Sequence, residues 1–257
     1  MERRYQAVLS SLGTSQITYR RPSTVAWWSA AFPGFGHMLL NMHLKGNILF
    51  LFEVIINVNA NLNLSMVYTF SGQFEMAKSI LNTRWIMIYI PFYIFCIWDS
   101  YRSAMDINKL YSLTEHQPVH MPVFIMKNFE LCYLDKRIPF VASIWSLFLP
   151  GLGQLYNRRT LTAFAFLVWT LVITFYSRDL ESLQLLFGGD FIHSTGTVNM
   201  EWLLFIPSLS FGAAFDAYVT TMEYNKLFNS EQKEFLHEEW QSDDFKRSFL
   251  NENGELH

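Results

Sequence analysis

Residues 149–159 read LPGLGQLYNRR and residues 32–36 read FPGFG, so a Pro-Gly-x-Gly step occurs twice, 117 residues apart. A second pair of stretches keeps the same spacing without a gap, WDSYRSAMDINKLY at 98–111 and FDAYVTTMEYNKLF at 215–228. Self-similarity at a fixed period indicates that one structural unit has been duplicated. The sequence therefore predicts two copies of a single unit.

The repeat divides the chain into five segments. These are an N-terminal segment at 1–23, a first unit at 24–111, a linker at 112–140, a second unit at 141–228 and a polar tail at 229–257. The linker is rich in apolar residues interrupted by charged ones, which predicts an amphipathic helix at a membrane interface. The tail alternates acids with aromatics, and it is either a solvated segment or a docking segment for a cytoplasmic partner.

Composition indicates a membrane protein. Of the 257 residues, 51% are hydrophobic and only 16% are charged, whereas a typical soluble domain has about 25% charged residues. The charges are nearly absent from several long stretches and crowd between them. The formal net charge of −3 gives no basic surplus for binding nucleic acid. We therefore expect an all-α integral membrane protein embedded in the lipid bilayer.

Each unit contains three apolar segments. They lie at 25–40, 46–62 and 85–105 in the first unit, and at 138–156, 161–177 and 202–222 in the second. The second and third segments of each unit approach the roughly 20 residues that a spanning helix needs. The first segment is interrupted by Pro-Gly-x-Gly, because proline removes a backbone donor and glycine is a poor helix former. It is therefore expected to form a re-entrant or interfacial hairpin.

Two topologies follow from these segments, with four crossings or with six transmembrane helices. Lys and Arg concentrate in cytoplasmic loops, and four crossings with a cytoplasmic N-terminus leave only Lys78, Arg84 and Arg178 outside. Six crossings would place more basic residues outside and would invert the second unit. The sequence thus favours four crossings in the cell membrane, with both termini cytoplasmic. The two units would be parallel and related by a pseudo-two-fold axis along the membrane normal.

The PGLGQLY stretch and the aromatic-Asp step resemble the bacterial relatives of the TM-two domain, a family of two-helix transmembrane hairpins. The matching residues are Pro150, Gly151, Gly153, Gln154, Tyr156, Phe215 and Asp216 in the second unit, and Pro33, Gly34, Gly36, Gly46, Trp98 and Asp99 in the first. The first unit departs from the pattern at His37 and Leu39. The resemblance implies a membrane topology and a scaffold or accessory role, and it implies no catalytic residues.

Asp99 and Asp216 occupy matching positions, as do the Asn-Lys pairs at 108–109 and 225–226, which are predicted to end their helices. A carboxylate within a bilayer is costly and marks a candidate functional site. The alternative is structural, with each Asp accepting hydrogen bonds from backbone N–H groups freed at the Pro-Gly-x-Gly step. Arg102 lies three residues after Asp99 and could pair with it, although position 219 in the second unit is Val.

Glu53 and His37 break the repeat symmetry. Glu53 lies in the apolar stretch ILFLFEVII, and its counterpart is Thr170. It could bond another helix or a partner chain, or it could be a proton or cation site. His37 could be a packed histidine, a ligand or a pH sensor. We therefore name Glu53, His37 and Arg102 as the possible ion or partner site.

No sequence motif indicates catalysis. The two cysteines show no metal-ligand spacing, and no nucleotide-binding loop or hydrolase signature is found. We therefore expect no enzyme activity, no catalytic residue, no metal and no cofactor. The expected function is a multi-pass membrane scaffold or accessory subunit, with a membrane protein, a cytoplasmic protein or a second copy as its partner. The alternative is a small oligomeric transporter or channel that uses Glu53 as an intramembrane site.

Overall fold

The computed structural model describes residues 7–10, 13–114, 124–126, 131–133 and 135–239, and these residues are mostly helical. The helices of the first half are α1 (Pro22–Ala31), α2 (Phe35–Leu39), α3 (His43–Ala60), α4 (Leu62–Phe70), α5 (Phe74–Ile80) and α6 (Thr83–Thr114). Those of the second half are α7 (Pro139–Phe148), α8 (Leu152–Tyr156), α9 (Thr160–Ser177), α10 (Asp179–Phe187), α11 (Phe191–Thr197), α12 (Met200–Leu203) and α13 (Phe205–Glu239). Two antiparallel strand pairs join β1 (Ala7–Ser10) to β2 (Gly13–Gln16), and β3 (Phe124–Met126) to β4 (Leu131–Tyr133).

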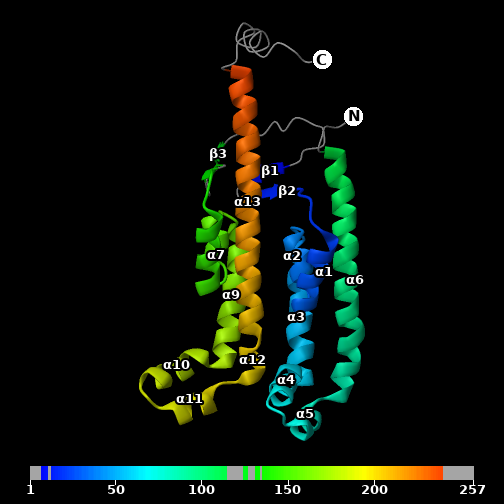
Figure 1. The fold of residues 1–257 in the computed structure, drawn as a ribbon, viewed down its shortest axis with the longest axis vertical. Helices are drawn as coiled ribbons and strands as arrows, with labels where there is room; N and C mark the ends of the chain where they lie inside the picture. Colours follow the sequence, from blue (N-terminus) through cyan, green and yellow to red (C-terminus); the bar gives the residue numbers. More distant parts are fainter. Residues whose placement is uncertain (1–6, 11–12, 115–123, 127–130, 134, 240–257) are drawn as a thin grey trace.

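The long helices α3, α6, α9 and α13 run along the long axis of the molecule (Figure 1). Helices α4, α5, α10 and α11 lie at one end. At the opposite end lie β1, β2 and the C-terminal ends of α6 and α13, so each half of the chain runs down the long axis and returns.

Several helices are long and apolar enough to cross a membrane. Within the described residues, Thr160–Ser177 and Met200–Lys233 meet this criterion as single helices. The pairs α3 with α4 and α5 with α6 meet it together, but they bend by 60° and 90°. By length and composition, the described residues therefore include two helices that could cross a membrane, or up to four if each bent pair is one span.

Each first apolar segment is broken where Pro-Gly-x-Gly predicts a break. Gly34 and Gly151 follow the prolines and adopt left-handed backbone angles, with φ of 92° and 112°. A side chain is strained at such angles. A Cβ on Gly151 would also lie 2.7 Å from the carbonyl oxygen of Ala163. The step therefore needs glycine both for its turn and for close packing against the following helix.

The local structure recurs at the spacing of the sequence motifs. Each of α7 to α11 begins and ends 117 residues after its counterpart among α1 to α5. The left-handed residues follow the same spacing, as Gly34 with Gly151, Asn41 with Arg158, Asn61 with Arg178, and Gly72 with Gly189.

Two local predictions are wrong in the described residues. The linker helix is contradicted where Phe124–Met126 pairs with Leu131–Tyr133 as strands. These residues include aromatic and β-branched side chains, which favour strands. The Asn-Lys pairs at 108–109 and 225–226 were predicted to end their helices, but α6 and α13 both continue beyond them.

An aromatic seam joins the two units. Trp28 packs on Phe215 with 4.8 Å between ring centroids, and Phe50 packs on Trp169 at 4.1 Å. Other buried members come from both units, including Phe32, Phe35, Phe166, Phe205 and Leu209. A hydrophobic core of the described residues thus lies between the units and fixes how they pack, and a further cluster, with Val25, Leu40 and Ala104, lies within the first unit.

The seam does not follow the predicted pseudo-two-fold axis. Such an axis would repeat the contact of Trp28 with Phe215 as a contact of Trp98 with Trp145. Instead Trp98 is 53% exposed and Trp145 is 51% exposed, on helices at opposite sides of the molecule (Figure 1). The two units therefore present different faces to one another.

Candidate functional site

Asp99 lies at the centre of a polar cluster in the first unit. Its Oδ2 lies 2.6 Å from His37 Nε2 and 2.5 Å from Lys45 Nζ. His37 is fully buried on α2, whereas the Lys45 side chain on α3 is partly exposed. The cluster therefore joins α2, α3 and α6, and it includes the predicted residues His37 and Asp99.

Asp216 lies at the centre of the matching cluster in the second unit. Its Oδ2 accepts from Gln154 Nε2 at 3.0 Å and from Arg159 Nη1 at 2.8 Å. The Arg159 and Asp216 side chains are only 5% and 3% exposed. Thr220 Oγ1 also accepts from Arg159 Nη1 at 3.0 Å. The matching positions 99 and 216 thus both hold an acid, but the cation beside it is Lys45 in the first unit and Arg159 in the second.

The predicted partners of the two acids are corrected by these contacts. Asp99 and Asp216 bind side chains, and not the backbone N–H groups freed at Pro-Gly-x-Gly. In the second unit the freed N–H of Gly153 instead donates to Ser146 Oγ at 3.1 Å. Ser146 then donates to Gln154 Oε1 at 3.0 Å. A buried serine on α7 therefore accepts the hydrogen bond of the backbone N–H that the Pro-Gly-x-Gly step leaves free. Asp216 does not have to accept it and can bind Arg159.

Burial lowers the pKa of His37 below its ordinary value of 6.5, although hydrogen bonding to Asp99 opposes the shift. The neutral ring can donate from Nε2 to Asp99, while the buried Nδ1 has no hydrogen-bond partner in the part of the chain that the structure describes. His37 is therefore a proton-sensitive contact inside the protein. The counterpart Gln154 makes a similar contact that cannot titrate.

Arg102 does not pair with Asp99. Its guanidinium lies over the Trp98 ring, 5.5 Å from the centroid. This geometry allows a cation–π contact. Lys45 takes the position beside Asp99 that the sequence interpretation considered for Arg102. The proposed grouping of Glu53, His37 and Arg102 is thus not found as one site.

Polar bonds cross the seam at the same end as these clusters. Arg159 Nη2 reaches Asn41 Oδ1 at 3.3 Å and His43 Nε2 at 3.4 Å, both in the first unit. Arg20 Nη1 lies 2.9 Å from Glu223 Oε1, and Arg20 Nη2 donates to Oε2 at 2.9 Å. These contacts fix the register between the units.

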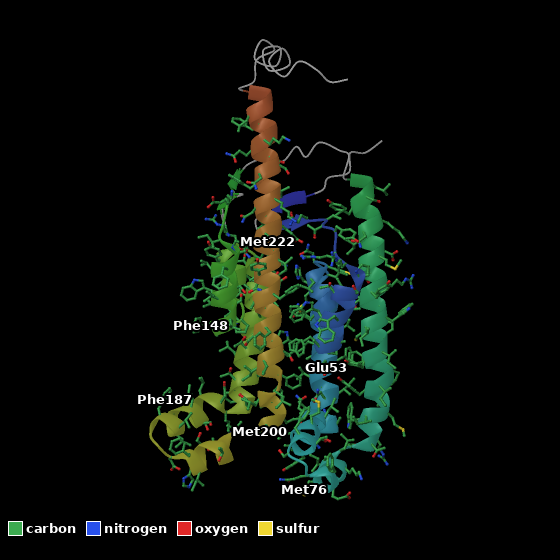
Figure 2. The ribbon with its side chains drawn as sticks, in the orientation of Figure 1. Glu53, Met76, Phe148, Phe187, Met200 and Met222 are labelled. Atoms are coloured by element: carbon green, nitrogen blue, oxygen red, sulfur yellow. The ribbon has the colours of Figure 1, made fainter. Side chains whose placement is uncertain are left out.

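Glu53 lies on α3, near the middle of the long axis (Figure 2), and its side chain contacts α6. Its Oε1 accepts from Asn57 Nδ2 at 3.0 Å and from Tyr89 OH at 3.2 Å. Its Oε2 is buried without a hydrogen-bond partner among the described residues. Asn57 also contacts Asn63 at 3.3 Å. Glu53 is therefore held between helices, with one oxygen left over.

Glu201 was missed by sequence reasoning, and it connects the units at the other end. Its Oε2 accepts from the backbone N–H of Leu64 at 2.6 Å, and its Oε1 from that of Asn63 at 3.4 Å. The first backbone N–H groups of a helix have no partner within the helix, and here they belong to α4. A carboxylate from the second unit thus caps a helix of the first.

The arrangement favours a structural role for most buried polar groups. No cluster of His, Cys, Asp and Glu suited to a metal is found in the part of the chain that the structure describes. A cavity at the seam, lined by His43, Asn47 and Thr162 among apolar and aromatic residues, measures about 10 Å³, which is about one water molecule. An open groove of about 740 Å³ at the other end is lined by Tyr68, Arg178 and Glu181, among others.

Comparison of the chain with protein-family models, curated proteins and solved structures found no significant match.

Proposed function

We propose that this chain is a multi-pass membrane protein of two parallel, duplicated units related to the TM-two hairpins. Each unit would have a Pro-Gly-x-Gly hairpin and two crossing helices, with both termini cytoplasmic. Its proposed function is that of a non-enzymatic scaffold or accessory subunit of a bacterial membrane complex.

Helix length and charge support the four-crossing arrangement. Helices α3 and α9 have 18 residues each, or about 27 Å at 1.5 Å per residue, close to the roughly 30 Å of a bilayer core. Lys78, Arg84 and Arg178 lie at the end that carries α4, α5, α10 and α11. The other basic residues would then be cytoplasmic, as the positive-inside rule favours.

The observation that carries the scaffold proposal is the use of buried polar groups to bind one helix to another. Arg159 holds Asp216 and also reaches Asn41 and His43 across the seam. The seam cavity of about 10 Å³ is too small for a substrate. This arrangement would give a rigid membrane body on which a partner can be held.

A partner can be sought at the C-terminal end of α13, which extends beyond β1 and β2 (Figure 1). Phe235 and Leu236 are exposed there. We expect a photoreactive amino acid at either position to give one defined protein adduct in native membranes. The same group at the exposed Glu75, on α5 at the opposite end of the molecule, is the control and should give none. Absence of any stoichiometric adduct from 235 and 236 would contradict docking at this end.

A transporter or channel is the second candidate, because Glu53 Oε2 is buried and no described residue forms a hydrogen bond with it. In proteoliposomes, Glu53→Gln should then abolish a pH-driven proton or cation flux that the unchanged protein supports. Thr170→Val, at the counterpart position, should retain the flux. An unchanged protein that carries no flux would exclude this candidate for those ions.

A further inference from the structure

The internal seam is a head-to-tail contact. The first unit contributes Trp28 and Phe32, which pack on Phe215 and Phe205 of the second unit with centroid distances of 4.8 Å and 6.3 Å. Residues 117 positions away from these four do not make the mirrored contacts. A contact that joins two different faces of similar units leaves one copy of each face unused.

One unused face lies on the first unit. Its residues correspond to the seam residues Phe205, Phe215 and Trp169 of the second unit, and they are Ile88, Trp98 and Phe52. We call these three residues the outer face of the first unit. They are 53%, 53% and 51% exposed.

The other unused face lies on the second unit. Its residues correspond to the seam residues Trp28, Phe32 and Asn47 of the first unit, and they are Trp145, Leu149 and Phe164. We call these three residues the outer face of the second unit. They are exposed: Trp145 lies on α7, Leu149 directly follows α7 and Phe164 lies on α9, at the side of the molecule away from α6 (Figure 1).

The two outer faces are complementary when one is placed on the other as in the seam. The contact of Trp28 with Phe215 would become one of Trp145 with Trp98, and that of Phe32 with Phe205 would become one of Leu149 with Ile88. Aromatic and aliphatic groups thus meet groups of the same kind. Trp169 Nε1 donates to Asn47 Oδ1 at 3.1 Å in the seam, and the corresponding pair is Phe52 with Phe164.

The charges at the inner end also correspond. The ion pair of Arg20 with Glu223 would be repeated by Arg137 with Asp106, which have the same signs. Asp106 is exposed and contacts Lys109 at 3.1 Å. This matters because apolar faces alone gain little by association in lipid, whose chains are equally apolar. Aromatic packing and a terminal ion pair would supply the specificity.

We propose that a second copy of this chain docks the outer face of its second unit on the outer face of the first unit. The contact repeats the internal seam between chains, and the copies assemble head to tail. This inference rests on the proposed membrane embedding, because the bilayer holds all copies parallel. The alternative is that both outer faces contact only lipid.

Cysteine cross-linking tests the contact in the full chain. Cys96 and Cys132 are first replaced by Ala and Ser. Two differently tagged copies, one with Trp98→Cys and one with Trp145→Cys, are then expressed together and treated in membranes with a short bifunctional thiol reagent. We expect a dimer that contains both tags. Dimers that link only two Trp98→Cys copies, or only two Trp145→Cys copies, would overturn the head-to-tail contact.

Controls separate this contact from random collision and from misfolding. Met87→Cys, which is 70% exposed beside the proposed face, should cross-link to position 145 much less than position 98 does. Trp28→Cys with Phe215→Cys in one chain should cross-link internally, which reports an intact seam. With the internal cross-link present, absence of the 98–145 product refutes the proposal.

A charge variant provides a second measurement. Asp106→Lys should reduce the 98–145 product several-fold, because it places two cations at the inner end of the contact. An undiminished yield would count against the repeated ion pair. Accessibility of an exposed site such as Glu75→Cys to an external thiol reagent is recorded in the same cells. A failure of membrane topology is thereby distinguished from a failure of self-association.

Discussion

At the scale of single residues, the two matched acids differ in how much they depend on their cations. Asp216 and Arg159 are almost fully buried, whereas Asp99 and Lys45 are partly exposed. Removing one partner of a buried pair costs about 3–5 kcal/mol, because the other charge is left uncompensated. Exposed pairs contribute about 0–1 kcal/mol.

Asp216→Asn should therefore lower the free energy of unfolding by about 3–5 kcal/mol, and Asp99→Asn by much less. Denaturant unfolding in detergent, followed by tryptophan fluorescence, measures both. Equal losses in the two variants would show that burial does not determine the contribution of these pairs.

His37 gives a pH dependence with a defined sign. Its pKa is lowered in the folded protein by burial, so the unfolded chain binds more protons as the pH falls through about 6.5. The contribution of His37 to stability should therefore decrease on acidification below that pH. Asp99 and Lys45 are the charged groups that face the ring.

His37→Gln introduces the residue found at the matching position 154, and it should remove the part of the pH dependence of thermal unfolding that His37 contributes between pH 7 and about 5.5. On acidification over this range the variant should therefore lose less stability than the unchanged protein. The exposed His193, changed to Gln, is the control and should keep the dependence of the unchanged protein. An identical pH dependence in His37→Gln and the unchanged protein would contradict the prediction.

At the scale of elements, the turns between helices depend on glycines in different surroundings. Gly34 and Gly72 both have positive φ, but a Cβ on Gly34 would overlap the carbonyl of Gly46, whereas that on Gly72 would meet open space. A left-handed backbone alone costs a non-glycine residue about 1–2 kcal/mol.

Gly72→Ala should therefore destabilise the protein by about 1–2 kcal/mol, and Gly34→Ala by clearly more. Melting temperatures in detergent compare the two variants directly. A larger loss at Gly72 would mean that the hairpin at α4 and α5 is packed more tightly than its exposure indicates.

The sequence predicted elements where local chemistry decides them. The breaks after Phe32 and Leu149 were predictable, because proline and glycine act within a few residues. The positions of Lys45 and Glu201 were not, because each meets its partner only after the helices pack. The linker was misjudged since dense apolar residues with scattered charges suit a strand as well as a helix.

At the scale of the whole molecule, the arrangement of the ends gives a topology prediction. Glu75 lies on α5 at one end, and Ser112 and Asn229 lie near the C-terminal ends of α6 and α13 at the other. A membrane-impermeant thiol reagent should label Glu75→Cys in intact cells, and it should label Ser112→Cys and Asn229→Cys only after lysis. Labelling of Ser112→Cys in intact cells would exclude the four-crossing arrangement.

The cap that Glu201 places on α4 has a consequence for the history of the chain. On the proposed duplication, two identical first units would present Arg84 to the same helix start, where a cation is disfavoured. Two identical second units would bring Arg159 against Arg158, the counterpart of Asn41. The internal seam therefore needs one unit of each kind on these two faces, and a single unit left by simple deletion could not form the same seam with a second copy of itself.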